Sequence, residues 1–241
     1  MRLKNVVQRN LGRSGFQLVR TPLEGTLARD VKRVIDDRGI RTILDIGAHV
    51  GMFGLMLRGL GFEGQIVSFE PSPKPFTELV SKIDGSWQAV QLALGDSDGV
   101  ADLHIYQEHE EFTSLRRPSD YGLSNFGLTV IETVQVPVRR LDDVVEEMGV
   151  DAGSTFVKID TQGHEQAVIS GGSAFLSSAA ALQIEIPMFG LYEGAPIGTV
   201  LMLQVQQMGF DLVGMFPVHD HPRPLVPVEF DGLFARGAKV G

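Results

Sequence analysis

Five acidic residues stand where five apolar runs of this sequence end, and they are the first candidates for chemistry. The residues are Asp45, Glu70, Asp96, Asp160 and Glu185. In an open α/β sheet, ligands bind at the carboxyl ends of the strands. A single acid at a strand end is usually the N-cap of the next helix. Five of them at one expected edge favour a binding or catalytic site.

The turn after the first apolar run carries two glycines, Gly47 and Gly51, in the segment ILDIGAHVGMFG. A dinucleotide site would show the spacing G-x-G-x-x-G, which lets a pyrophosphate approach the helix. Its second glycine is absent here, because Ala48 and His49 follow Gly47. We therefore expect a nucleoside site without a pyrophosphate. The alternative is that both glycines only permit tight packing of strand against helix.

Glu70 and Asp45 narrow the choice of ligand. A carboxylate at the end of the second run can accept hydrogen bonds from both hydroxyls of a ribose. Asp45, next to the turn, would repel a phosphate but suits a ligand with an amino group. S-adenosylmethionine combines a ribose, an amino acid end and a cationic sulfonium. The two acids thus favour this cofactor.

The elements that must position these residues alternate between apolar runs and helical spacing, as in a mostly parallel α/β sheet with helices on both faces. Helices are expected over residues 24–38, 51–61, 72–83, 163–177 and 196–209. Strands are expected over residues 42–47, 65–71, 89–96, 154–160 and 181–186. Two final strands, 210–217 and 228–236, are expected to pair antiparallel at the sheet edge.

Two segments depart from this alternation. Residues 99–107 and 130–145 are interpreted as extended, so that a hairpin and loop at about 100–138 are inserted into a single domain spanning 24–241. Long loops of this kind tend to be functional. Residues 1–23 form a basic N-terminal arm, which we interpret as solvated. The alternatives are contact with an anionic partner or membrane surface, and a role in a homodimer.

Composition excludes several classes of function. The net charge of −9 argues against general nucleic-acid binding. No apolar run approaches the roughly 18 to 20 residues of a membrane span, and no signal-peptide pattern stands at the N-terminus. The sequence has no cysteine, so disulfides and thiolate metal sites are excluded. These features are typical of a cytoplasmic protein.

Several segments together resemble the FkbM-type methyltransferases: LDIGAHVGMFG, IVSFEPSP, LALGDSDGVADLHIY, RRLDDVV, and VKIDTQGHEQAVISGG followed by LQIEI. The resemblance runs from about residue 40 to 236. It implies a class I, Rossmann-like fold and S-adenosylmethionine as cofactor. It also implies methylation of an oxygen on a sugar, glycan or polyketide-type product.

The resemblance also assigns cofactor-binding positions. The matching residues are Asp45, Gly47 and Gly51 in the first motif, Glu70 at the ribose, and Leu94 and Asp96 where the adenine is lined. Two residues depart from the family pattern. His49 stands where Asn is more frequent, near the amino acid end of the cofactor. Gln162 stands where many members have Glu, which weakens any claim that this position is a catalytic acid.

Methyl transfer to a hydroxyl needs an aligned acceptor and a base. One hypothesis makes His164 the base, with Asp160 or Glu185 orienting it or the acceptor, because histidine titrates near pH 6.5. The alternative is a solvated histidine in the first turn of a helix. A second hypothesis has these residues hold Mg²⁺. Hydrogen bonding of the acids to a sugar is preferred over the metal.

The sequence thus predicts an S-adenosylmethionine-dependent O-methyltransferase acting on a small-molecule or glycan hydroxyl. The alternatives are a nicotinamide-dependent oxidoreductase and a non-catalytic nucleoside-binding module. Arg116 and Arg117, in the insertion, are considered as contacts for an anionic acceptor. No pattern in the sequence names the acceptor.

Overall fold

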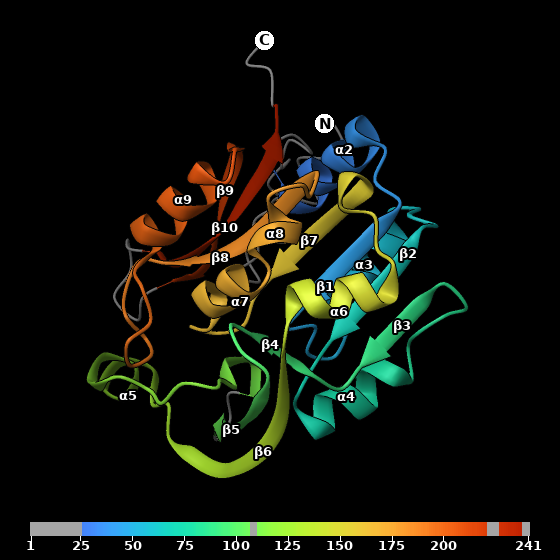
Figure 1. Cartoon of the computed structure of the whole chain (residues 1–241). Helices are drawn as coiled ribbons and strands as arrows, with labels where there is room; N and C mark the ends of the chain where they lie inside the picture. Colours follow the sequence, from blue (N-terminus) through green and yellow to red (C-terminus); the bar gives the residue numbers. More distant parts are fainter. Residues whose placement is uncertain (1–25, 107–109, 221–226, 238–241) are drawn as a thin grey trace, which may run out of the picture.

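The computed structural model describes residues 26–106, 110–220 and 227–237, so the expected arm over residues 1–23 lies outside them. A seven-stranded sheet has the order β3-β2-β1-β7-β8-β10-β9 (Figure 1). Its strands are β1 (Thr42–Ile46), β2 (Gln65–Phe69), β3 (Trp87–Val90), β7 (Thr155–Ile159), β8 (Ala181–Pro187), β9 (Phe210–Asp220) and β10 (Pro227–Arg236). The first five strands in sheet order run parallel to one another. β10 pairs antiparallel with β8, and β9 pairs antiparallel with β10. The predicted sheet and its antiparallel edge pair are confirmed.

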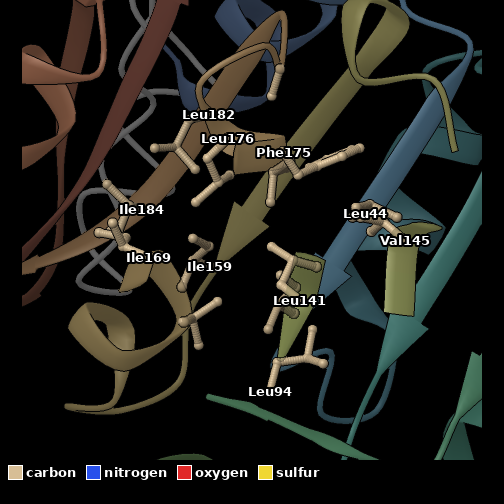
Figure 2. Close-up of a cluster of buried hydrophobic side chains, with 14 of the residues drawn as sticks. Leu44, Leu94, Leu141, Val145, Ile159, Ile169, Phe175, Leu176, Leu182 and Ile184 are labelled. Carbon is tan, nitrogen blue, oxygen red and sulfur yellow. The ribbon is translucent and has the colours of Figure 1, made fainter. Parts of the chain in front are cut away.

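Helices cover both faces of this sheet, as predicted. One face carries α2 (Leu27–Arg38), α3 (Met52–Gly59) and α4 (Pro73–Val80). The other carries α6 (Leu141–Met148), α7 (Glu165–Gly171), α8 (Ser173–Leu176) and α9 (Gly198–Gln207). Figure 2 shows the core on the second face, where Leu44 of β1, Ile159 of β7 and Ile184 of β8 lie among side chains of α6, α7 and α8. Strands buried on both faces read as continuous apolar runs.

A smaller sheet lies at the end of the large sheet toward which β1 and β7 run (Figure 1). It has the order β4-β6-β5, with β4 (Ala93–Gly95), β5 (Gly99–Tyr106) and β6 (Val130–Arg140). β5 and β6 pair antiparallel, and β4 pairs parallel with β6. The 3₁₀ turn η1 (Glu110–Phe112) and α5 (Asp120–Phe126) lie between β5 and β6; a further 3₁₀ turn, η2 (Ala152–Ser154), precedes β7.

Three predicted elements are wrong in detail. The single strand over 89–96 is two strands, because the chain leaves the large sheet after Val90 and β4 joins the small one. Residues 141–145 were expected to be extended but begin α6, where Leu141, Val144 and Val145 share one buried helical face. The helix over 163–177 is broken at Gly172, where a side chain would collide with that of Leu141.

Among the described residues, no helix is long and apolar enough to cross a membrane.

Candidate active site

A cavity of about 220 Å³ lies at the carboxyl ends of β1, β2 and β7. The small sheet and the segment Glu111–Leu115 of the insertion form its opposite wall. Seven of the predicted site residues line it: Gly47, His49, Glu70, Leu94, Asp160, His164 and Glu185. The other three, Asp45, Gly51 and Asp96, are not part of the lining. The fold thus brings the acids at the ends of β2, β7 and β8 to one cavity.

The glycine turn after β1 is shaped by contacts that exclude side chains. Gly47 has a φ of 77°, and a methyl group on it would overlap the backbone carbonyl of Asp160. His49 has a φ of 48°, which is uncommon for a residue with a side chain. Gly51 lies farther on, where a side chain would collide with Leu79. Gly47 therefore lets the chain pass close to the end of β7, whereas Gly51 permits close packing of the turn against the side chain of Leu79.

Glu70 is held in place by the same turn. Its Oε2 accepts a hydrogen bond from the backbone N–H of His49 at 2.7 Å, and its Oε1 accepts one from the N–H of Ser72 at 2.8 Å. Burial raises the pKa of Glu70 to about 7, against the effect of these two hydrogen bonds. Each carboxylate oxygen keeps a second lone pair. A pair of neighbouring hydroxyls in the cavity could therefore donate to it.

Asp45 lies behind the cavity, fully buried within β1. Its Oδ2 accepts a hydrogen bond from the Ser68 hydroxyl at 3.3 Å, and its Oδ1 lies 3.6 Å from the ammonium of Lys158. Burial raises the pKa of Asp45, and the charge of Lys158 opposes that rise. Lys158 thus lies between Asp45 and Asp160, and of these three residues Asp160 lines the cavity.

Lys158 joins the ends of β1 and β7, and the sequence reasoning gave it no role. Its ammonium lies 3.1 Å from Oδ2 of Asp160 and donates to the carbonyl of Gly47 at 3.4 Å. Burial acts to lower the pKa of Lys158, but the charges of Asp160 and Asp45 raise it overall. The signal that could have found it is a charged residue inside an apolar strand, FVKID.

Gln162 lies between the two acids at the ends of β7 and β8. Its Nε2 donates to Oδ1 of Asp160 at 3.0 Å and to Oε2 of Glu185 at 2.8 Å. Burial, followed by the charge of Asp160, raises the pKa of Glu185 well above its ordinary value. The acid pair is therefore fixed by an amide and Lys158, and the burial that raises the pKa of Glu185 favours the protonated form of its carboxyl group.

His164 caps the N-terminus of α7, and its ring lies against Gly95. Its Nδ1 is buried and has no hydrogen-bond partner among the described residues. Burial, together with the charge of Arg116, lowers the pKa of His164 to about 4, although the charge of Asp96 opposes this. The imidazole is therefore neutral at pH 7. No hydrogen bond or ion pair among the described residues joins it to Asp160 or Glu185, which were expected to orient either the histidine or the acceptor.

Glu165, one residue on, shapes the loop that carries these groups. Its Oε1 accepts hydrogen bonds from the N–H groups of Thr161 and Gly163, at 2.9 and 3.1 Å. Burial raises the pKa of Glu165 to about 7.

The described residues contain no group of three or more His, Cys, Asp or Glu side chains placed to hold a metal ion. The Mg²⁺ hypothesis invoked Asp160 and Glu185, but these acids already accept hydrogen bonds from Lys158 and Gln162. The donor set therefore does not fit a resident divalent cation.

Comparison with known proteins decides the family. A model of the methyltransferase FkbM domain matches residues 45–212 of the chain.

The chain belongs to the FkbM methyltransferase family.

This FkbM protein is similar to the 2-O-methyltransferase NoeI of Sinorhizobium fredii (strain NBRC 101917 / NGR234). The identity is 30% over 186 residues, which are 73% of this chain and 74% of NoeI. Methyltransferase 1 of Beauveria bassiana (strain ARSEF 2860) is 28% identical over 143 residues, 54% of this chain and 57% of that protein. The match bears out the predicted enzyme, an S-adenosylmethionine-dependent O-methyltransferase, and its cofactor.

Two solved structures resemble the FkbM chain more distantly. A TehB-like SAM-dependent methyltransferase of Corynebacterium glutamicum covers 97% of both chains at 13% identity, with a TM-score of 0.39. A protein of the NADB-Rossmann superfamily from Streptococcus agalactiae covers 90% of this chain and 72% of its own at 11% identity, with a TM-score of 0.47. Neither adds to the family assignment.

The chemical character of the residues that line the FkbM cavity suits S-adenosylmethionine. Glu70 offers its carboxylate to a pair of hydroxyls, and the neighbouring wall is apolar. That wall includes Phe69, Leu92, Leu94 and Leu103, which suit a flat base. The lining carries carboxylates but no Lys or Arg among the described residues, which suits a cationic sulfonium and ammonium.

Proposed function

We propose that this FkbM enzyme methylates a hydroxyl of a sugar or another polyhydroxylated natural product that is neutral or carries an amine. The observation that supports this acceptor class is the charge of the cavity. Its described lining includes the acidic side chains of Glu70, Glu111, Asp160 and Glu185, and no lysine or arginine. An acceptor with a carboxylate or phosphate would meet no basic side chain in this lining and would be repelled by those of the acids that are ionised.

The two arginines considered for an anionic acceptor, Arg116 and Arg117, both lie outside the described lining. Arg116 donates from its Nη1 to the backbone carbonyl of Glu193 at 3.1 Å. Its contacts hold the insertion in place, and its charge helps to keep His164 neutral. The acid-lined half of the cavity, near Asp160 and Glu185, is the proposed acceptor site. NoeI, a relative named as a 2-O-methyltransferase, supports oxygen as the methylated atom.

We assign cofactor binding to Gly47, His49 and Glu70 in the turn, with Leu94 at the base, and a supporting position to Asp45 and Gly51. The proposed role of Asp96 is electrostatic, because it lies outside the lining. When bound, S-adenosylmethionine supplies a methyl group on a positively charged sulfur. The residues of the chain then have to align a hydroxyl, exclude water and remove a proton.

Asp160 is the proposed proton acceptor. It lines the cavity, and its side chain keeps 31% of its exposure while Lys158 lies 3.1 Å away. Burial raises the pKa of Glu185, and in its protonated form this carboxyl group can donate a hydrogen bond to the acceptor. The neutral His164 can accept one, but a conjugate acid with a pKa of about 4 binds a proton weakly. His164 therefore positions the acceptor in this account.

An acceptor screen with methyl-labelled S-adenosylmethionine tests the proposal. Neutral and amino-sugar glycosides are compared with uronic acids and sugar phosphates of similar size. Transfer confined to the neutral and amine-bearing compounds supports the proposal, and preferential transfer to the anionic ones refutes it. The same screen after exhaustive treatment with EDTA checks the metal alternative, which predicts loss of activity.

Two finer properties are also part of the proposal. We propose a cytoplasmic location, supported by the cysteine-free composition and the intracellular supply of the cofactor. We also propose a homodimer, supported by the exposed apolar side chains of Leu212, Val213 and Met215 on the edge strand β9. Cell fractionation tests the location. Light scattering of the purified protein tests the dimer, which a monomer mass would contradict.

A further inference from the structure

Gln162 is the most constrained residue of the cavity, and the methyl-transfer chemistry does not by itself require it. It adopts a φ of 54°, in the left-handed region that residues with a side chain rarely occupy. It is buried, with a relative exposure of 8%. Backbone strain of this kind persists where the surroundings over-determine a conformation, often at functional sites.

The amide group of Gln162 can make contacts that no carboxylate could make at this position. Its Nε2 has two hydrogens, and they point to Asp160 and Glu185, at 3.0 and 2.8 Å. A glutamate here would place a third carboxylate between two others. The amide therefore separates the acids and donates to both.

The other end of Gln162 is joined to the insertion. The Tyr192 hydroxyl lies 2.8 Å from Oε1 of Gln162 and 2.9 Å from the backbone carbonyl of Phe112, and its one proton can serve either. The hydroxyl of Ser114 donates to the backbone carbonyl of Gln162 at 2.6 Å. Phe112 and Ser114 both line the cavity. Gln162 therefore contacts the two acids with its Nε2 and is also hydrogen-bonded to the opposite cavity wall through Ser114.

We propose that Gln162 and Tyr192 are positioning residues that couple the acid pair, Asp160 and Glu185, to the cavity wall formed by Glu111–Leu115. In this proposal the Tyr192 hydroxyl donates its one proton to Oε1 of Gln162 rather than to the carbonyl of Phe112, and this fixes the amide so that Nε2 faces the acids. The catalytic meaning of the coupling rests on the proposed function, in which the acids bind the acceptor. The coupling itself is a property of the protein without any acceptor.

The charged groups around the acid pair determine what a carboxylate at position 162 would do. Asp160 and Lys158 face it from β7, Glu165 from α7, Glu185 from β8, and Glu229 and Asp231 from β10. Lys158 is the single cation in this set. A carboxylate at position 162 would therefore bind a proton more readily than a carboxylate exposed to solvent. Only in the protonated form would it offer a hydrogen-bond donor, and then one donor in place of the two of the amide.

Hydrogen exchange of residues 110–118, measured by mass spectrometry and corrected for intrinsic rates, reports on the wall. Tyr192→Phe removes the hydroxyl alone. Its matched control is Tyr106→Phe, since the Tyr106 hydroxyl donates to the backbone carbonyl of Arg116 in the same insertion, at 3.0 Å. Gln162→Glu keeps the shape of the side chain and adds the charge. Binding of S-adenosylhomocysteine, measured by calorimetry, serves as the check on folding.

In Tyr192→Phe we expect exchange of 110–118 to rise about fivefold to tenfold, the effect of one lost hydrogen bond. We also expect the titration of Glu185, followed by carboxyl NMR and assigned with Glu185→Gln, to move upward. Tyr106→Phe is expected to leave that titration unchanged. In Gln162→Glu the exchange is expected to exceed the wild-type rate about tenfold at pH 8 and to return toward it at pH 5.5.

A Tyr192→Phe variant in which the titration of Glu185 does not move would overturn the coupling, even if the loop loosens. A pH-independent effect of Gln162→Glu would also overturn it. If Gln162→Glu does not fold, the comparison of the two tyrosine variants still decides. None of these readings uses an acceptor. An acceptor screen that fails would therefore refute the proposed function and leave the coupling standing.

Discussion

Glu165 gives the most quantitative prediction, because its side chain is buried and a substitution can replace a single oxygen of its carboxyl group. Glu165→Gln keeps the oxygen that accepts from Thr161 and Gly163, and replaces Oε2. That second oxygen is buried and has no hydrogen-bond partner among the described residues. The variant therefore removes a titration while preserving the loop contacts.

The magnitude follows from the pKa. Burial raises the pKa of Glu165 from 4.5 to about 7 in the folded protein. The folded state thus binds more protons than the unfolded state between these values, so stability falls as pH rises through this window. At about 1.4 kcal/mol for each tenfold change in proton affinity, the loss is about 3 kcal/mol between pH 4.5 and pH 8. Below pH 4.5 this contribution is fully present.

Urea unfolding of wild type and Glu165→Gln at pH 5, 6, 7 and 8 measures the effect. The difference in free energy of unfolding should grow in favour of the variant as pH rises, by about 3 kcal/mol in total. Glu132→Gln, at an exposed position of β6, is the control and should show no such trend. Parallel pH curves for wild type and Glu165→Gln would refute the reasoning about burial.

Four further substitutions test the site. Lys158→Met leaves the fully buried carboxyl group of Asp45 without its cationic partner, so the free energy of unfolding should fall by about 3 to 5 kcal/mol at pH 7 in denaturant titrations. Gly47→Ala should destabilise the fold and weaken binding of S-adenosylhomocysteine, whereas Gly85→Ala, where a methyl group meets no atom within 4 Å, should be silent. Asp160→Asn should lower kcat about 100-fold or more, while His164→Ala should lower it about tenfold with cofactor binding intact. The reverse order of these two kinetic effects would make His164 the base.

The elements that position the cofactor turn could be predicted because their signals are local. Buried parallel strands are continuous apolar runs, and the acids that close them mark the ligand edge. The break between β3 and β4 could not be predicted, because apolar residues flank Gln91 on both sides and nothing in the order of residues shows a change of sheet. The start of α6 could not be predicted either, because the helix follows directly on the strand residues of β6.

The contacts within the site could not be predicted from the sequence, because the fold brings their partners together from distant segments. Asp45 was expected at the ligand, and the structure places Lys158 between it and the cavity. Gln162 was noted only as a departure from a family pattern. Its partners Glu185 and Tyr192 lie 23 and 30 residues away in sequence, so no spacing rule could have joined them. The burial of His164, which lowers the pKa of its imidazole, is likewise a tertiary effect.

Titration calorimetry with S-adenosylhomocysteine and with NAD, on wild type and Glu70→Gln, tests the central claim most directly. The account predicts one-to-one binding of S-adenosylhomocysteine and no binding of NAD. It also predicts an affinity about tenfold or more lower in Glu70→Gln, since hydrogen bonds to a charged acceptor are worth about 1.5 to 3 kcal/mol. Binding of NAD, or a Glu70→Gln variant that binds S-adenosylhomocysteine as tightly as wild type, would contradict the assignment of this cavity.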